Sequence, residues 1–438
     1  ALHFSEANLQ WVITAYAITF GGFLLLAGRT ADLLGRRRVF LAGVVIFTVA
    51  SLVCGLAWSE TVLIISRAVQ GFGAAVITPS ALSIVMTAFE EGSERNKALG
   101  IWGALGGGGA AVGVLAGGVL TKYLGWEWIF FVNVPVGAAA LLLAPRFVRE
   151  SRSDRKQTQD VAGAITITSG LALLVYAVSE APNHGWTSGR TIALLIISAV
   201  LLIAFLFVES RAKHPLMPFR IFKVSTVAGA NVAGLLLGAV VFANFFLLTL
   251  YVQNVLHWSA LKTGLTFVAT AGSAVLWAGV AQALVTKIGA KTVMAMGFVA
   301  TTAGLLWYTQ IPVHASYASD LLPGYLLIGF ALPFSFIPVS IAALAGVEQH
   351  EAGLASGLIN TAQQVGGAIG VAVTSSVLLT HSNTLLKQGT QFPAAWTSGT
   401  HWAFWVAVGI AVAGLAATLL LVRNDELATA EDLVAAPG

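Results

Sequence analysis

The sequence has 438 residues, of which 57% are hydrophobic and only 10% are charged. A soluble globular chain carries about 25% charged residues, and the mean hydropathy here is +0.85. This composition excludes a water-soluble enzyme and an intrinsically disordered chain. The single cysteine, Cys54, lies within an apolar run, so neither a disulfide framework nor a cysteine-based metal cluster is expected.

Apolar runs of roughly 20 residues recur along the chain, which is the length that a helix needs to cross a bilayer. The alternating pattern of transmembrane β-strands is absent from the sequence. We therefore predict an all-α polytopic membrane protein with thirteen spans. They lie near 9–27, 39–57, 61–85, 98–120, 129–148, 161–179, 191–208, 225–250, 263–284, 292–310, 321–345, 354–379 and 401–422.

The lysines and arginines are distributed unequally between the two sides of these spans. Eighteen of the 23 basic residues fall in one set of alternate loops, four fall in the other set, and Arg67 lies inside a span. The set that is rich in basic residues comprises 28–38, 86–97, 146–156, 209–223, 285–291 and the segment from 423 onward. Because cytoplasmic loops carry the excess of positive charge, this set and the C-terminus are assigned to the cytoplasm. The basic balance therefore indicates topology, and nucleic acid is not an expected partner.

Thirteen spans place Ala1, which is not a methionine, on the external side. We expect one more span upstream, which would complete a first bundle of six helices. The spans would then form two six-helix bundles joined by two additional central helices, and such paired bundles are typical of secondary transporters. The expected parts are an N-terminal bundle (1–149), a cytoplasmic linker (150–160), two central spans (161–208), a second linker (209–223), a C-terminal bundle (224–422) and a cytoplasmic tail (423–438).

The loop GRTADLLGRRRVFL (28–41) joins the first two spans. A carboxylate at a membrane boundary is costly unless it is paired or caps a neighbouring helix N-terminus. This loop resembles the cytoplasmic signature of the major facilitator superfamily, which implies a latch that holds the two bundles together when the cytoplasmic side is closed. An ordinary positive-inside loop is the alternative, but it would not explain the acid and both glycines. The latch residues are Gly28, Asp32, Gly35, Arg36 and Arg37.

The stretch LIISRAVQGFGAA (63–75) carries Arg67 about six residues inside its span, roughly 9 Å deep. An arginine inside a span suggests a functional role by default. The thirteen predicted spans contain no acid in their apolar interiors. The stretch resembles the second signature of the same superfamily. That resemblance implies proton coupling through Arg67 and Gln70, with an acid in the additional span that we expect upstream of residue 1. The alternative is that Arg67 extends outward toward Glu60.

The span from 98 to 120 contains a run of glycines, GALGGGGAAVGVLAGG (103–118). Glycines repeated at every fourth position form a face on which helices approach closely. The run resembles the third signature, found in antiporters, although Val114 follows Gly113 where that signature usually has proline. Close packing without a gating role is the alternative. The residues of this antiporter signature are Gly109, Gly113, Gly117 and Gly118.

Four more stretches resemble the fourteen-span drug:proton antiporter branch of the superfamily: 126–137, 215–222, 251–264 and 357–372. Aromatic and amide side chains inside the spans suit a mainly apolar cavity for lipophilic compounds, although each of them is also compatible with simple packing. The expected cavity residues are Tyr16, Phe20, Asn244, Phe245, Asn360, Gln363 and Gln364.

We therefore expect a monomeric, multi-pass protein of the inner (cytoplasmic) membrane that exports lipophilic drugs or antibiotics in exchange for protons by alternating access. A phosphate-binding glycine–lysine loop is absent, and the eight histidines show no metal-ligand spacing. Neither an enzyme activity nor a cofactor nor a metal is therefore expected. The alternatives are a dedicated exporter of one metabolite or lipid, and a membrane sensor or scaffold that transports nothing.

Overall fold

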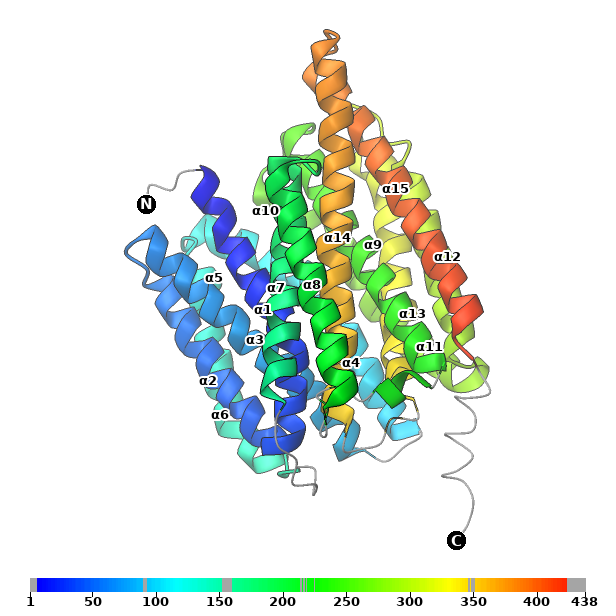
Figure 1. Ribbon diagram of the computed structural model, residues 1–438. Coiled ribbons are helices and arrows are strands. Elements are labelled where there is room, and N and C mark those ends of the chain that lie inside the picture. Colours follow the sequence, from blue (N-terminus) through cyan, green and yellow to red (C-terminus); the bar gives the residue numbers. More distant parts are fainter. Residues whose placement is uncertain are drawn as a thin grey trace. The chain divides into compact units, whose positions relative to one another are not determined.

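The computed structural model describes residues 6–89, 93–151, 160–212, 215, 217, 219–223, 225–345, 347 and 351–423 (Figure 1). Parts of the two predicted linkers, 150–160 and 209–223, and nearly all of the predicted tail, 423–438, lie outside these residues. Within the described ranges every regular element is a helix and no strand occurs.

The first eight α-helices in the described chain run to Arg211. They are α1 (Glu6–Leu34), α2 (Arg36–Gly55), α3 (Glu60–Ala88), α4 (Ser93–Tyr123), α5 (Trp128–Phe131), α6 (Asn133–Phe147), α7 (Val161–His184) and α8 (Gly189–Arg211). After the short helix η1 (Phe219–Lys223) the remaining elements are α9 (Ser225–Asn254), α10 (Ala260–Thr266), α11 (Val268–Ile288), α12 (Ala290–Tyr308), η2 (Tyr317–Leu321), α13 (Leu322–Leu344), α14 (Ala352–Lys387) and α15 (Phe392–Leu421).

Twelve helical segments of the described chain are long and apolar enough to cross a membrane, and each coincides with a predicted span. The one remaining predicted span, 98–120, falls in α4, where many side chains lie outside the described residues. Several helices, α14 and α15 among them, extend beyond their predicted spans, because hydropathy reports only the apolar part of a helix. Helix α14 has 36 residues, and α15 begins at Phe392, with a proline in its first turn that favours helix initiation. The chain is a multi-pass membrane protein.

The described chain divides into two compact units that interleave in sequence. The first contains residues 1–90, 120–223 and 347–361, and the second contains 91–119, 224–346 and 362–438. Helix α14 therefore contributes its first turns to the first unit and its remainder to the second.

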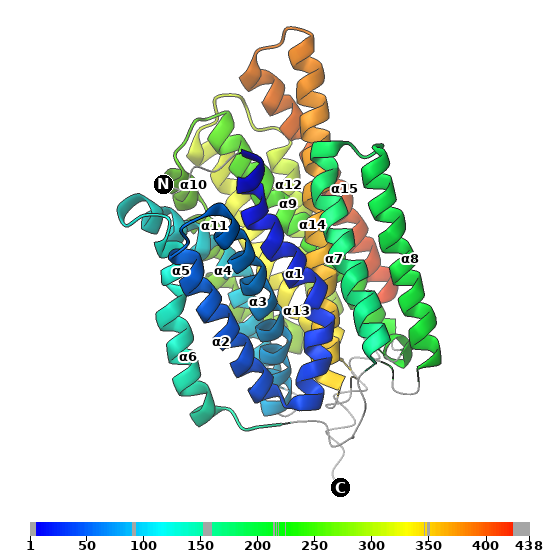
Figure 2. The same ribbon diagram turned by 60° about the vertical axis from the view of Figure 1, so that its left-hand side comes forward.

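In the first unit, α1 packs against α2, α3 and α7, and α2 packs against α3 and α6. Helices α7 and α8 form a hairpin whose two arms lie side by side (Figure 2). Local signals define this hairpin. The Asp160 carboxylate accepts from the Gly163 N–H at the start of α7 (2.9 Å), Gly185 ends α7 with a φ of 88°, and the Ser188 hydroxyl accepts from the Thr191 N–H at the start of α8 (3.2 Å).

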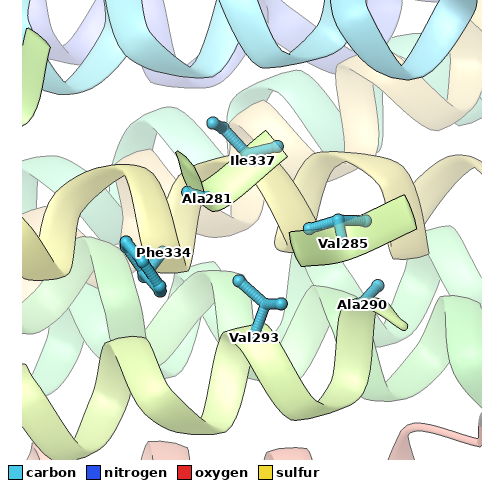
Figure 3. Packing of buried hydrophobic residues seen from close by; sticks show 6 residues of the cluster. All are labelled: Ala281, Val285, Ala290, Val293, Phe334 and Ile337. Atoms are coloured by element: carbon cyan, nitrogen blue, oxygen red, sulfur yellow. The ribbon is translucent and has the colours of Figure 1, made fainter. Parts of the chain in front are cut away.

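In the second unit, α13 contacts α9, α11 and α12, and α15 contacts α9 and α12. Figure 3 shows a buried cluster to which α11 and α12 contribute alanine and valine side chains and α13 contributes the larger Phe334 and Ile337. The cluster consists of Ala281, Val285, Ala290, Val293, Phe334 and Ile337. Alternating side-chain sizes of this kind allow membrane helices to pack by close contact, since lipid supplies little hydrophobic driving force between them.

Helices α9 and α14 approach each other through glycines. A Cβ atom at Gly366 or Gly370 would collide with the backbone carbonyl of Leu235 or Ala239, respectively. These glycines are therefore required by the distance between the two helix backbones.

We predict that Gly366→Ala lowers the thermal stability of the protein, because the added methyl group must push two helices apart, at a typical cost of about 1–3 kcal/mol. The control is Gly409→Ala on α15, where an added Cβ meets no described atom within 4 Å. There alanine should be neutral or stabilising, since it forms helices better than glycine. Unfolding midpoints measured in detergent test this, and equal midpoints for both variants would contradict the packing.

Candidate functional site

Asp32 lies in the last turn of α1 and is 0% exposed. Its Oδ1 accepts hydrogen bonds from Arg36 Nη2 (2.7 Å) and Nε (3.1 Å). The same carboxylate accepts from two backbone N–H groups in the first turn of α14, those of Gly353 (3.1 Å to Oδ1) and Leu354 (3.0 Å to Oδ2). The first N–H groups of a helix have no partner within the helix and carry a partial positive charge. Asp32 is thus both paired with a base and bound to a helix N-terminus.

The contact between α1 and the first turns of α14 depends on glycine. A Cβ atom at Gly28 would collide with the Gly353 carbonyl, and one at Gly357 would lie 2.9 Å from the Leu24 carbonyl. Any larger residue at Gly28 would hold the two backbones apart and lengthen the Asp32 contacts. The first glycine of the signature loop is therefore explained by close approach.

Gly35 joins α1 to α2 with a φ of 108°, a conformation that favours glycine. A Cβ atom there would also lie 2.8 Å from an oxygen of Glu150. The Glu150 carboxylate occupies this space because it caps α2: it accepts from the backbone N–H groups of Arg37 (3.1 Å) and Arg38 (3.2 Å). The second glycine of the loop thus provides both the turn and the room for an acid from the segment after α6.

The other arginines of the loop are also tied to this segment. Arg37 Nη1 donates to the Val148 carbonyl (3.2 Å), and Arg36 donates its backbone N–H to the Ser151 carbonyl (2.9 Å). Arg38 is largely exposed, with its Nε 3.7 Å from Glu150. The loops 28–38 and 146–151, which the charge pattern assigned to the same side, therefore lie at the same end of the first unit.

Arg67 lies on α3, facing α1 within the first unit. Its Nε donates to the Val12 carbonyl (2.9 Å), its Nη1 donates to the Gln70 side-chain oxygen (2.5 Å), and its guanidinium lies 4.3 Å from the centre of the Tyr16 ring. Buried Gln70 in turn donates to the Ser51 hydroxyl (2.6 Å). Among the described residues no carboxylate lies within ion-pair distance of Arg67. Its charge is instead met by a carbonyl, an amide and an aromatic face.

The predicted antiporter glycines lie on α4. An added Cβ at Gly109, Gly113 or Gly117 meets no described atom within 4 Å, and Gly118 is partly exposed. The role of these glycines as an antiporter signature stays a prediction.

The predicted cavity residues are divided between the two units. Tyr16, Phe20 and Asn360 belong to the first unit, and Asn244, Phe245, Gln363 and Gln364 belong to the second. Within the first unit, the Tyr16 and Phe20 rings stack with centroids 5.7 Å apart, and the Asn360 amide donates to the Ser356 carbonyl (2.8 Å). Within the second, Asn244 is 2% exposed and its Oδ1 has no hydrogen-bond partner among the described residues. The Phe245 and Phe267 ring centroids lie 5.1 Å apart. The cavity itself stays a prediction.

Comparison with known proteins places this arrangement in a family. The family model of the Major Facilitator Superfamily matches residues 1–371. The chain belongs to the Major Facilitator Superfamily. The resemblance inferred from the signature loops and the predicted all-α major facilitator fold are thereby confirmed.

Several relatives carry names that state a role, and two of them are described here. The chain is 39% identical over 423 residues to the puromycin resistance protein pur8 of Streptomyces alboniger, covering 96% of this chain and 84% of the relative. It is 40% identical over 380 residues to the cephamycin export protein CmcT of Amycolatopsis lactamdurans, covering 86% and 78%, respectively. The crystal structure of the human organic anion transporter MFSD10 (TETRAN) matches with a TM-score of 0.68 at 17% identity, over 93% of this chain and 83% of that one. At that identity, the last match shows the fold alone.

Several residues around the superfamily's signature loop escaped sequence reasoning. Glu150 is the first acid after the span that ends near residue 148, and its position there was the available signal. Gly353 and Gly357 have the spacing of a small-residue contact face, which was also visible in the sequence. Neither pattern names its partner, because the partner lies more than a hundred residues away.

We predict that Asp32→Asn lowers the transport rate at least about tenfold, the effect of losing roughly 1.4 kcal/mol of interaction. The amide keeps the shape of the carboxylate but loses its charge toward Arg36 and toward the two N–H groups of α14. The control is Glu94→Gln, because Glu94 is exposed on α4. Efflux from cells is compared at equal amounts of membrane-inserted protein, and wild-type efflux by Asp32→Asn would contradict a role for this carboxylate.

Proposed function

We propose that this chain exports lipophilic drugs or antibiotics across the inner (cytoplasmic) membrane, working by alternating access and driven by protons. The observation that carries this proposal is that two relatives, 39% and 40% identical over most of their lengths, are named for antibiotic resistance and for antibiotic export. On this proposal the substrate passes through chemically unchanged, the transporter is a monomer, and its C-terminus is cytoplasmic.

The contacts of Asp32 support a gating role for the loop at 28–38. A latch must be strong when closed and must be able to break as a unit. Asp32 receives four hydrogen bonds, two from Arg36 and two from the first turn of α14. The two bonds to α14 depend on the position of a separate helix, so a displacement of α14 would break both together. Arg36 is on the next helix in sequence and would remain as the partner of the exposed carboxylate.

The surroundings of Arg67 support a role in proton coupling. A guanidinium retains its proton under all physiological conditions, so a coupled cycle needs another group that titrates near it. Arg67 is held on three sides by Val12, Gln70 and Tyr16, and it has a strong electrostatic influence on any acid that approaches. We propose that Arg67 and Gln70 control the protonation of such an acid during transport.

The predicted cavity and division into bundles remain part of the proposal. The aromatic pair Tyr16 and Phe20 and the amides Asn244 and Asn360 would provide apolar surface with a few polar anchors, which suits lipophilic compounds. A six-helix bundle at each end of the chain and two central spans over 161–208 would provide the moving parts. The glycines of α4 would help to set the direction of transport, as the resemblance to the antiporter signature implies.

A dedicated exporter of one compound is the second candidate function. It is favoured by the names of the two relatives described above, each of which refers to one antibiotic or one antibiotic class. A panel of unrelated antibiotics, applied to cells with and without the protein, separates the candidates. Tolerance to several classes supports multidrug export, and tolerance to one class supports the dedicated exporter. Unchanged tolerance to every compound, with the protein present in the membrane, would contradict both.

We predict that the lumen of inverted membrane vesicles containing the protein becomes more alkaline as substrate enters it, because protons leave in exchange, and that transport stops when the proton gradient is collapsed. Arg67→Lys should lose this coupling although it keeps the positive charge, because lysine cannot bond to Val12 and Gln70 in the same planar geometry.

The matched control for this variant is Lys122→Arg, since Lys122 is an exposed base near the end of α4. A fluorescent pH indicator inside the vesicles provides the measurement. Transport that continues at its full rate after complete collapse of the proton gradient would exclude proton coupling.

A further inference from the structure

The segment that follows the α7–α8 hairpin belongs to the first unit, and two of its described side chains are buried. Met217 is 7% exposed and Ile221 is 5% exposed. The Met217 N–H donates to Glu209 Oε1 (2.5 Å), and the Pro215 carbonyl accepts from Arg29 Nη2 (3.5 Å). Arg29 lies on α1, one turn before Asp32. The described residues of the segment are thus anchored both to α8 and to the end of α1 that carries the signature loop.

Arg220 extends from this segment to the start of α14. Its Nη2 lies 2.6 Å from Glu351 Oε1. The Glu351 side chain is 7% exposed and that of Arg220 is 48% exposed. Glu351 directly precedes α14, and the Gly353 and Leu354 N–H groups that bind Asp32 follow within three residues. Two charged side chains from distant parts of the chain, Asp32 and Arg220, therefore hold residues of the same helix end.

The two contacts act on α14 in a complementary way. Asp32 binds the backbone of the first turn, whereas Arg220 binds the side chain of the preceding residue. Removing the base costs more free energy at a nearly buried carboxylate than at an exposed one, because water cannot replace the lost partner. The Arg220–Glu351 pair should therefore contribute more than a typical surface ion pair.

We propose that Arg220 is a positioning residue of the transport cycle, whose ion pair with Glu351 secures the first turn of α14 on α1 and so ties the α7–α8 hairpin to the Asp32 latch. This inference rests on the proposed function for its place in transport. The contact itself can be tested without any substrate. On this proposal, α14 leaves α1 only when both the Asp32 and the Arg220 contacts break.

The test measures how often the start of α14 becomes accessible to water. The native Cys54 is replaced by serine, and a cysteine is introduced at Ala355, which is 1% exposed in the first turn of α14. Inverted vesicles are treated with a membrane-impermeant maleimide, well below the unfolding temperature of each variant. Arg220→Ala and Glu351→Gln should each raise the labelling rate about threefold to tenfold, as expected for the loss of one partly buried ion pair.

The charge exchange Arg220→Glu with Glu351→Arg should restore slow labelling, because it rebuilds the pair in reverse. The control is Arg211→Ala, since Arg211 is an exposed base in the last turn of α8 that stacks on Phe207; its labelling rate should stay unchanged. Unchanged labelling in both Arg220→Ala and Glu351→Gln would overturn the proposal, and so would a charge exchange that labels as fast as the single variants. Because labelling needs no transported compound, its result can be interpreted even if the exporter proposal fails.

Discussion

The burial of one carboxylate governs the end of the first unit at which the signature loop lies. Asp32 is completely withdrawn from solvent, and a charge in that position is tolerated only if its oxygens are occupied by donors. Arg36 supplies two of these donors and the N-terminus of α14 supplies the other two. The requirement for donors explains why a helix that follows Asp32 by more than three hundred residues must begin beside it.

The glycines of the loop follow from the same requirement. The N–H groups of α14 reach the carboxylate only if the two helix backbones nearly touch, and Gly28 permits this approach to Gly353. At Gly35 the backbone turns with a positive φ, and the absence of a side chain leaves space for Glu150 to cap α2. The loop is thus a set of mutually dependent contacts, and its spacing in sequence reflects the geometry of three helix ends.

Sequence reasoning found the helices because apolar length is a local property, and each of the twelve membrane-length helices in the described chain coincides with a predicted span. It also found Asp32 and Arg36, because the signature is compact and contains both members of the pair. It missed Glu150, Arg220 and Glu351, because each binds a partner far away in sequence and lies in a charged segment, where acids and bases are common. At Gly109, Gly113 and Gly117 the spacing suggested a contact, but a repeat of small residues states only that a helix could approach, not which helix does.

Arg67 and Asp32 show two different ways to hold a charge in the same unit. Asp32 is neutralised by a base and two helix N–H groups, so the charge is locked to the position of α14. Arg67 binds a carbonyl, an amide and an aromatic ring, none of which carries a formal charge. Its positive charge is therefore stabilised in place but not neutralised, and it remains able to attract an anionic group. A charge that is neutralised through a separate helix suits a latch, whereas one that is held without neutralisation suits a site whose partner gains and loses its own charge.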